Sequence, residues 1–144
     1  MKRSSALTPL SHDHQHALAV ALALRRADAA GVAAAVERFR DFLATEGEAH
    51  FRIEEELVLP ALPPGDDEWS AAAARVREDH EAIRAAAEAP PAAVGEVRAL
   101  GRRLNDHVRF EERVLFAILE RRLPADELER LGRAAARAGK PRTG

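Results

Sequence analysis

The apolar residues of this chain recur every three or four positions along most of its length. That period places them on one face of an α-helix. Short stretches rich in proline and glycine interrupt the pattern, and such stretches end helices. We therefore predict helices over residues 8–30, 32–59, 68–88, 92–122 and 124–138.

Long helices joined by short connections pack as antiparallel neighbours. The predicted fold is thus all-α, an antiparallel up-down-up-down four-helix bundle with a short C-terminal fifth helix. A chain of 144 residues has a usual size for one domain with one core. We assign residues 1–138 to this domain and expect residues 139–144 to form a flexible tail.

Polar residues interrupt the inward-facing stripes at regular places. The first and third predicted helices each carry one histidine in an apolar row, and the second and fourth each carry a His-x-x-x-Glu pair. The two members of such a pair lie one turn apart on the same helix face. The inward polar residues are His14, His50, Glu54, His80, His107 and Glu111. An unbroken helical period also places Glu46, Leu57 and Val114 on the inward side.

The two His-x-x-x-Glu segments are near copies of each other. Residues 50–59 read HFRIEEELVL and residues 107–116 read HVRFEERVLF, with His, Arg and two Glu at the same offsets. An aspartate precedes the histidine in both other helices, at Asp13-His14 and Asp79-His80. The chain is therefore a loose repeat of a helical hairpin, and each unit contributes two histidines and one glutamate to the interior.

Buried histidines and carboxylates without partners would cost several kcal/mol each. A bound metal removes this cost, and imidazole with carboxylate suits iron, manganese, zinc or nickel. Two carboxylates at the same height on two helices can bridge two metals. We predict a dinuclear centre with Glu54 and Glu111 as bridges and the four histidines as terminal ligands.

Composition excludes several other classes of function. The chain has no cysteine, so disulfides, thiolate metal sites and iron–sulfur clusters are ruled out. A net charge of -2 gives no basic excess for nucleic-acid binding as a main task. No apolar run approaches 18 residues, the length that spans a membrane. Histidines follow the basic N-terminus too early for a signal-peptide core, so we expect a cytoplasmic protein.

From Leu10 to Ala138 the chain resembles the hemerythrin-like (HHE cation-binding) domain family. The resemblance rests on the two Asp-His pairs, the two His-x-x-x-Glu segments, and the runs EEELVLPAL and EERVLFAIL. In that family a four-helix bundle holds a non-haem di-iron site, and members carry or sense dioxygen, sense iron, or act in oxidative and nitrosative stress. The resemblance implies two carboxylate-bridged iron ions here. The ligands that it implies are His14, His50, Glu54, His80, His107 and Glu111.

The chain also departs from the family pattern. Oxygen-carrying hemerythrins have a second histidine one turn from the third-helix ligand, where this chain has Val76 and Arg84. Either one metal has one protein ligand fewer and binds water, or a nearby carboxylate such as Glu46 or Glu81 replaces the histidine. This difference argues against reversible oxygen carriage. The Glu-x-x-His spacing of ferritin-like sites is absent at all four inward histidines.

Other polar residues have simpler interpretations. His12 and His16 form an i,i+4 pair that we expect to be solvated, and Glu55, Glu56 and Glu112 are expected to form a solvated face. Asp13 and Asp79 either orient ligand histidines or serve as capping and exposed charges. Aromatic side chains are expected in the core; they are Trp69, Phe39, Phe42, Phe51, Phe110 and Phe116.

The leading hypothesis is a di-iron protein that binds or senses dioxygen, peroxide or nitric oxide, with this small molecule as its partner. One alternative is a di-iron enzyme that decomposes peroxide or oxidises a small substrate, although no substrate pocket or proton relay is evident in the sequence. Another is a metal storage, delivery or sensing protein that holds zinc or manganese. Partner proteins and oligomeric state are left open.

Overall fold

The computed structural model describes residues 4–139, and within that range it contains helices and turns but no strand. The all-α prediction is therefore confirmed. No helix in this range is both long enough and apolar enough to cross a membrane. The α-helices are α1 (Thr8–Arg25), α2 (Val32–Phe42), α3 (Glu48–Ile53), α4 (Asp67–Glu88), α5 (Val94–Phe110), α6 (Phe116–Arg122) and α7 (Ala125–Ala138).

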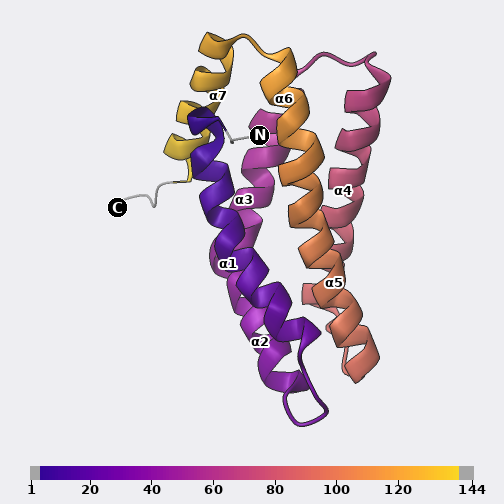
Figure 1. The fold of residues 1–144 in the computed structure, drawn as a ribbon. Coiled ribbons are helices and arrows are strands. Elements are labelled where there is room, and N and C mark those ends of the chain that lie inside the picture. Colours follow the sequence, from indigo (N-terminus) through magenta and orange to yellow (C-terminus); the bar gives the residue numbers. More distant parts are fainter. Residues whose placement is uncertain (1–3, 140–144) are drawn as a thin grey trace.

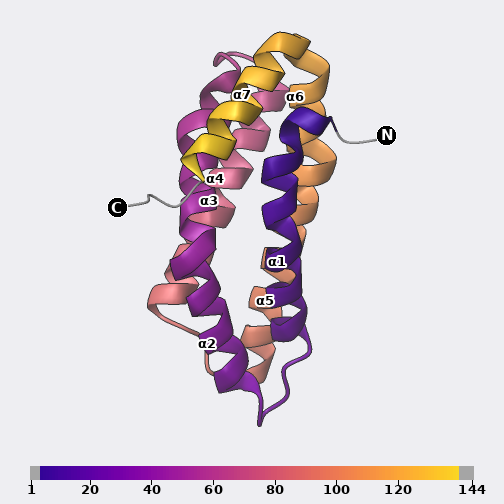
Figure 2. The same cartoon turned by 90° about the vertical axis from the view of Figure 1, so that its left-hand side faces the viewer.

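Figure 1 shows the long helices lying side by side. α1 packs along α5 and also against α2, and α4 packs against α5. α7 crosses one end of the molecule, where it contacts α1 and the short 3₁₀ turn η1 (Ser5–Leu7), as Figure 2 shows from the side.

Several helix ends differ from the predicted ones. α1 ends at Arg25 and not at residue 30, because the Asp28 carboxylate accepts a hydrogen bond from the Gly31 N–H at 2.8 Å and closes a turn instead. α5 starts at Val94, two residues later than predicted. The start of α4 agrees with prediction, since the Asp66 side chain accepts from the Trp69 N–H at 3.0 Å and caps the helix.

The predicted second and fourth helices are each a continuous helical run with wider π turns inside it. α2 passes into η2 (Leu43–Gly47) and α3 into η3 (Glu54–Val58), followed by a 3₁₀ turn, η4 (Leu59–Ala61). α5 passes into η5 (Glu111–Leu115) and then α6. A π turn inserts an extra residue relative to an α-helix and so shifts every later side chain around the axis.

This shift makes three sequence predictions wrong. Glu46 and Val114, expected to face inward, are exposed, and Leu57 is only partly buried. In each case the following residue takes the inward position; these residues are Gly47, Val58 and Leu115. The side chain of Val114 is 37% exposed, whereas Leu115 is 0% exposed. The apolar period is thus kept, but it is displaced by one residue at each π turn.

The apolar core consists of two clusters with a polar layer between them. In α1, Leu10 belongs to one cluster and Ala17 to the other, with His14 between them. In α4, Val76 and Ile83 flank His80 in the same way. The predicted aromatic residues are buried in these clusters, except Phe110, which is partly buried. The clusters hold the polar layer rigidly from both sides.

Gly132 allows α7 to approach η1 closely. A Cβ atom added there would overlap the carbonyl group of Ala6, whereas one added at Gly95 would meet nothing within 4 Å. We expect Gly132→Ala to lower the free energy of unfolding by about 1–3 kcal/mol, as overpacking does. Gly95→Ala is the matched control and should be neutral or slightly stabilising. Urea unfolding measures both, and equal stability of the two variants would contradict the close α7–η1 contact.

Candidate metal centre

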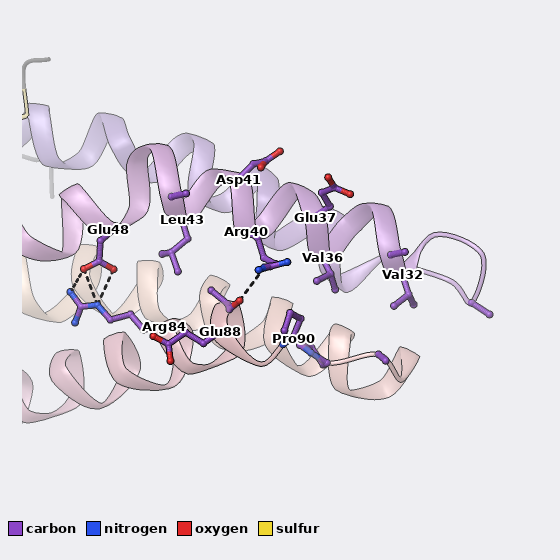
Figure 3. Close-up of a pocket in the computed structure, with 16 residues that line it drawn as sticks. Val32, Val36, Glu37, Arg40, Asp41, Leu43, Glu48, Arg84, Glu88 and Pro90 are labelled. Atoms are coloured by element: carbon purple, nitrogen blue, oxygen red, sulfur yellow. Dashed lines mark hydrogen bonds and ion pairs between the residues drawn. The ribbon is translucent and has the colours of Figure 1, made fainter.

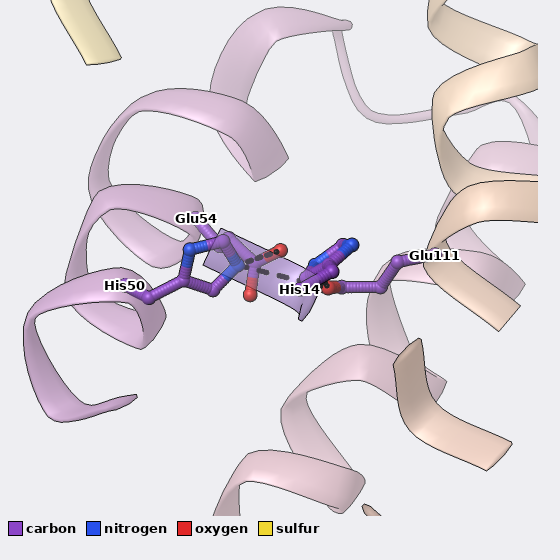
Figure 4. A group of neighbouring side chains, drawn as sticks. All are labelled: His14, His50, Glu54 and Glu111. Carbon is purple, nitrogen blue, oxygen red and sulfur yellow. Dashed lines mark hydrogen bonds and ion pairs between the residues drawn. The ribbon is translucent and has the colours of Figure 1, made fainter. Parts of the chain in front are cut away.

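The polar layer brings together all six inward polar residues predicted from the sequence. They form two groups, in each of which the four possible ligand atoms lie within 4.8 Å of one another. The groups are His14, His50, Glu54 and Glu111, and Glu54, His80, His107 and Glu111. Both glutamates are shared and have no exposed surface. Figure 4 shows the first group, with the two histidines beside the two carboxylates.

The contacts inside the layer repeat with an approximate twofold symmetry. His14 Nε2 lies 2.9 Å from Glu111 Oε1, and His80 Nε2 lies 3.0 Å from Glu54 Oε1. Within the two His-x-x-x-Glu pairs the distances are longer, 3.3 Å from His50 Nε2 to Glu54 Oε2 and 3.6 Å from His107 Nε2 to Glu111 Oε2. All four Nε2 atoms therefore point toward the pair of carboxylates.

Four atoms in this layer are buried without a hydrogen-bond partner among the described residues. They are His50 Nε2, Glu54 Oε2, His107 Nε2 and Glu111 Oε2. The distances within each His-x-x-x-Glu pair permit charge attraction, but neither pair forms a hydrogen bond, and the 3.6 Å of the second is too long for one. A buried polar atom without a partner costs roughly 1–3 kcal/mol. Cations bound between these atoms would satisfy all four, so the donor set fits metal ions.

Both carboxylates of the centre stand at the first position of a π turn. Glu54 opens η3 and Glu111 opens η5, four residues after His50 and His107 respectively. π turns inside α-helices are frequent at functional sites. Here the wider turn lets the glutamate face the centre while Val58 and Leu115, one turn later, stay in the apolar core.

A second layer of carboxylates contacts the outer nitrogen of every buried histidine. The Nδ1 contacts are His14–Glu112 at 2.8 Å, His50–Asp13 at 3.0 Å, His80–Glu55 at 2.7 Å and His107–Asp79 at 3.0 Å. A carboxylate at Nδ1 holds the proton on that nitrogen and leaves Nε2 for a metal. The second layer thus sets both the ring orientation and the tautomer that metal binding requires.

These contacts explain why acidic residues stand next to ligand candidates in the sequence. Asp13 precedes one ligand candidate but orients His50 on α3, and Asp79 in the same way orients His107 on α5. The orienting role suggested for both aspartates is confirmed. The prediction of a solvated face for Glu55 and Glu112 is wrong, because each contacts a buried histidine. The only sequence signal for these two was the repeated Glu-Glu dipeptide.

The two layers of carboxylates change the pKa of the groups between them. Burial alone would lower the pKa of His14, but hydrogen bonds to Glu111 and Glu112 outweigh it and raise that pKa to about 9. Burial also opposes the cationic forms of His50 and His107, yet the charges of Glu54 and Glu111 raise both pKa values. Burial would raise the pKa of Glu111, but the charge of His107 brings it well below its ordinary value. In the metal-free protein, protonated histidines and the ionised Glu111 therefore attract one another across the centre.

Arg84 supports the carboxylate that orients His80. It donates to both oxygens of Glu55, at 2.7 and 2.9 Å, and to Glu48 across the groove lined by α2 and the end of α4 (Figure 3). Its guanidinium also lies 5.4 Å from the ring centre of Phe51, which stacks on His80 at 3.8 Å. Arg84, which like Val76 lies one turn from His80, thus supplies a cation that acts on this candidate ligand through Glu55.

We expect Arg84→Ala to weaken metal binding by roughly 10-fold or more, because loss of a group that orients a ligand typically costs 10–100-fold. Arg84→Lys should recover part of the affinity, since a lysine keeps the charge but not the two-point contact. Metal affinities from competition with a chelator measure the effect. Arg121→Ala, which removes an exposed ion pair to Glu68, is the control. Equal affinities for Arg84→Ala and Arg121→Ala would contradict this role.

The carboxylates suggested as replacement ligands lie outside both groups. Glu81 is exposed on α4, and Glu46 is exposed on η2 in contact with His16. His12 and His16 are exposed, as expected. The described residues therefore offer six ligand candidates at the centre, and neither Glu46 nor Glu81 adds a seventh.

One comparison with known proteins found a match. A family model described as the hemerythrin HHE cation binding domain matches residues 5–119, which include all six ligand candidates and all four orienting carboxylates. Neither a curated protein nor a solved structure matched the chain.

Proposed function

Because the chain belongs to the hemerythrin HHE cation-binding domain family, we propose that it is a non-haem di-iron protein that binds or senses dioxygen, peroxide or nitric oxide. In this proposal its helices form an antiparallel four-helix bundle around the two iron ions. His14 and His50 hold one iron, His80 and His107 hold the other, and Glu54 and Glu111 bridge both. The observation that carries the proposal is the pair of four-atom groups that share both glutamates.

The charges and donor types of the centre support a pair of divalent ions. Nitrogen and carboxylate oxygen donors together suit iron, and the two glutamates offset half of the +4 charge of two such ions. The four carboxylates of the second layer add negative charge close by and strengthen the imidazole donors. When bound, iron would supply an open coordination position and exchangeable electrons for a small oxidant.

A small chamber beside the centre supports a small ligand. Its free volume is about 20 Å³, and its walls include His14, His50, His107 and Glu111 together with apolar residues. The apolar wall residues are Ala17, Phe42, Phe51, Leu104 and Val108. Such a volume holds about one water-sized molecule. Because candidate ligands line this chamber, a bound ion would leave room for at most a few atoms, and a larger organic substrate would need the side chains to move apart.

Anaerobic iron loading tests the proposal directly. We expect two Fe(II) ions per chain, and a visible charge-transfer band after dioxygen or nitric oxide is added. Zinc-loaded protein is the control, because zinc has no redox chemistry and should give no band. Fewer than two bound iron ions, or a spectrum that does not respond to either gas, would reject a di-iron gas-binding centre.

Zinc or manganese storage is the second candidate, because the same six donors suit these ions. The shared glutamates would then serve to hold the metal without redox work. Competition between iron, zinc and manganese for the metal-free protein distinguishes the two candidates. Retention of zinc at equal concentrations of all three, with no response of the iron form to dioxygen, would favour storage.

A further inference from the structure

Two histidines that the buried centre does not use lie on the exposed face of α1. His12 and His16 are four residues apart, so their rings project from the same side of the helix, one turn from each other. Two histidines at this spacing on one helix face can bind a single transition-metal ion together. Their exposure gives a metal ion direct access from solvent.

His16 repeats the arrangement found at the four buried histidines. Its Nδ1 contacts the carboxylate of Glu46 on η2, and its ring lies edge-on to Phe42 with centroids 5.1 Å apart. A carboxylate at Nδ1 directs the metal to Nε2, as in the second layer of the centre. Glu46 reaches His16 because the π turn η2 moves it from the predicted inward position to the surface.

Two residues that contact His16 also line the buried chamber. Glu46 and Phe42 line that chamber together with His14, His50 and Glu111. Phe42 and His16 also line a shallow groove on the surface between α1 and α2. Phe42 is thus common to the chamber and the surface groove, and the His16–Glu46 pair lies where the two meet.

We propose that His12 and His16 form a surface site for one divalent transition-metal ion, with Glu46 orienting His16, and that this site captures metal for the buried centre. The imidazole donors select borderline cations such as Ni²⁺, Co²⁺, Zn²⁺ and Fe²⁺ over Mg²⁺ or Ca²⁺. Capture at the surface needs only the residues named above, whereas delivery also rests on the proposed function of the buried centre.

Nickel binding to protein whose centre already holds two metal ions tests the surface site. We expect one further Ni²⁺ per chain by equilibrium dialysis, with paramagnetic broadening of the His12 and His16 ring signals. His12→Ala and His16→Ala should each weaken this binding by at least about 10-fold, because each removes one ligand. Glu46→Gln should weaken it by roughly 10-fold, because Glu46 orients His16. Gln15→Ala, an exposed change on the same helix, should leave it unchanged. The surface site would be overturned if no third ion bound, or if the histidine variants bound it as tightly as the wild type.

The rate at which metal-free protein takes up Co²⁺ tests delivery. We expect the His12→Ala, His16→Ala double variant to load several-fold more slowly, yet to reach the same two buried ions. Loading at the wild-type rate would overturn the delivery role. A wild-type protein that binds nickel at His12 and His16 but holds no buried pair would count against the proposed function and leave the surface site intact.

Discussion

Glu111→Ala is expected to remove both metal ions from the centre. Glu111 supplies a possible ligand atom to both four-residue groups, and it is fully buried. The remaining histidines would face each other across a cavity with one carboxylate instead of two. We expect no metal retained after dialysis, and a metal-free protein destabilised by about 3–5 kcal/mol, because buried histidine cations lose a counter-charge.

Glu56→Ala is the matched control for this change. Glu56 lies in the first copy of the repeated segment but is exposed and outside both groups. It should retain two ions and wild-type stability. Glu111→Gln separates charge from shape, since it keeps the volume of the side chain but supplies a neutral donor. Elemental analysis and circular dichroism measure metal content and folding, and two ions retained by folded Glu111→Ala would disprove a shared, bridging glutamate.

The six central residues could be predicted because each carries two independent signals. His50 and Glu54 show a polar pair in an apolar stripe, and the same pair recurs at His107 and Glu111. A chance surface pair would show neither the stripe nor the repetition. His14 and His80 follow from the same stripes and from the aspartate that precedes each. Repetition and periodicity therefore predicted which six polar residues meet in the interior.

The register beyond the ligands could not be predicted by the same reasoning. Past Glu111 a helical period allows either Val114 or Leu115; the sequence prediction took Val114, while the structure buries Leu115. The difference arises from one inserted residue in a π turn, and the apolar sequence around it suits both registers. A separate π turn, η2, moved Glu46 to the surface, which removed it as a candidate ligand and placed it against His16.

Two of the four orienting carboxylates were missed for a different reason. Glu55 and Glu112 lie between a buried and an exposed position, where charged residues are most often solvated. Their partners, His80 and His14, are distant in sequence, on α4 and α1. The helical period within one segment cannot predict a contact with another helix. Only the equal placement of Glu-Glu in both repeats indicated that the second glutamate has a role.

Metal-free protein is expected to be most stable between roughly pH 4.5 and 6.5 and to lose stability toward pH 9. His14 has a pKa raised from 6.5 to about 9, so its cation stabilises the fold fully below pH 6.5 and ceases to do so as pH rises through 9. A shift of this size corresponds to about 3 kcal/mol. His50 and His107, whose pKa values are also raised, act in the same direction. Glu111 has a lowered pKa, so its contribution is present above pH 4.5 and is lost in stronger acid.

Metal-loaded protein is expected to show the opposite trend over the same range. Metal binding requires the Nε2 atoms without protons, so a rise in pH removes the competing protons and strengthens binding. The stability difference between loaded and metal-free protein should therefore widen from pH 6 to pH 9. Urea unfolding of chelator-treated and metal-loaded samples at five pH values between 5 and 9 measures both curves. His14→Gln should flatten the metal-free curve, because it removes a titrating group whose pKa is raised to about 9. If the metal-free protein instead gains stability from pH 6.5 to 9, the buried histidines are neutral over that range. Their charges then do not balance those of Glu54 and Glu111.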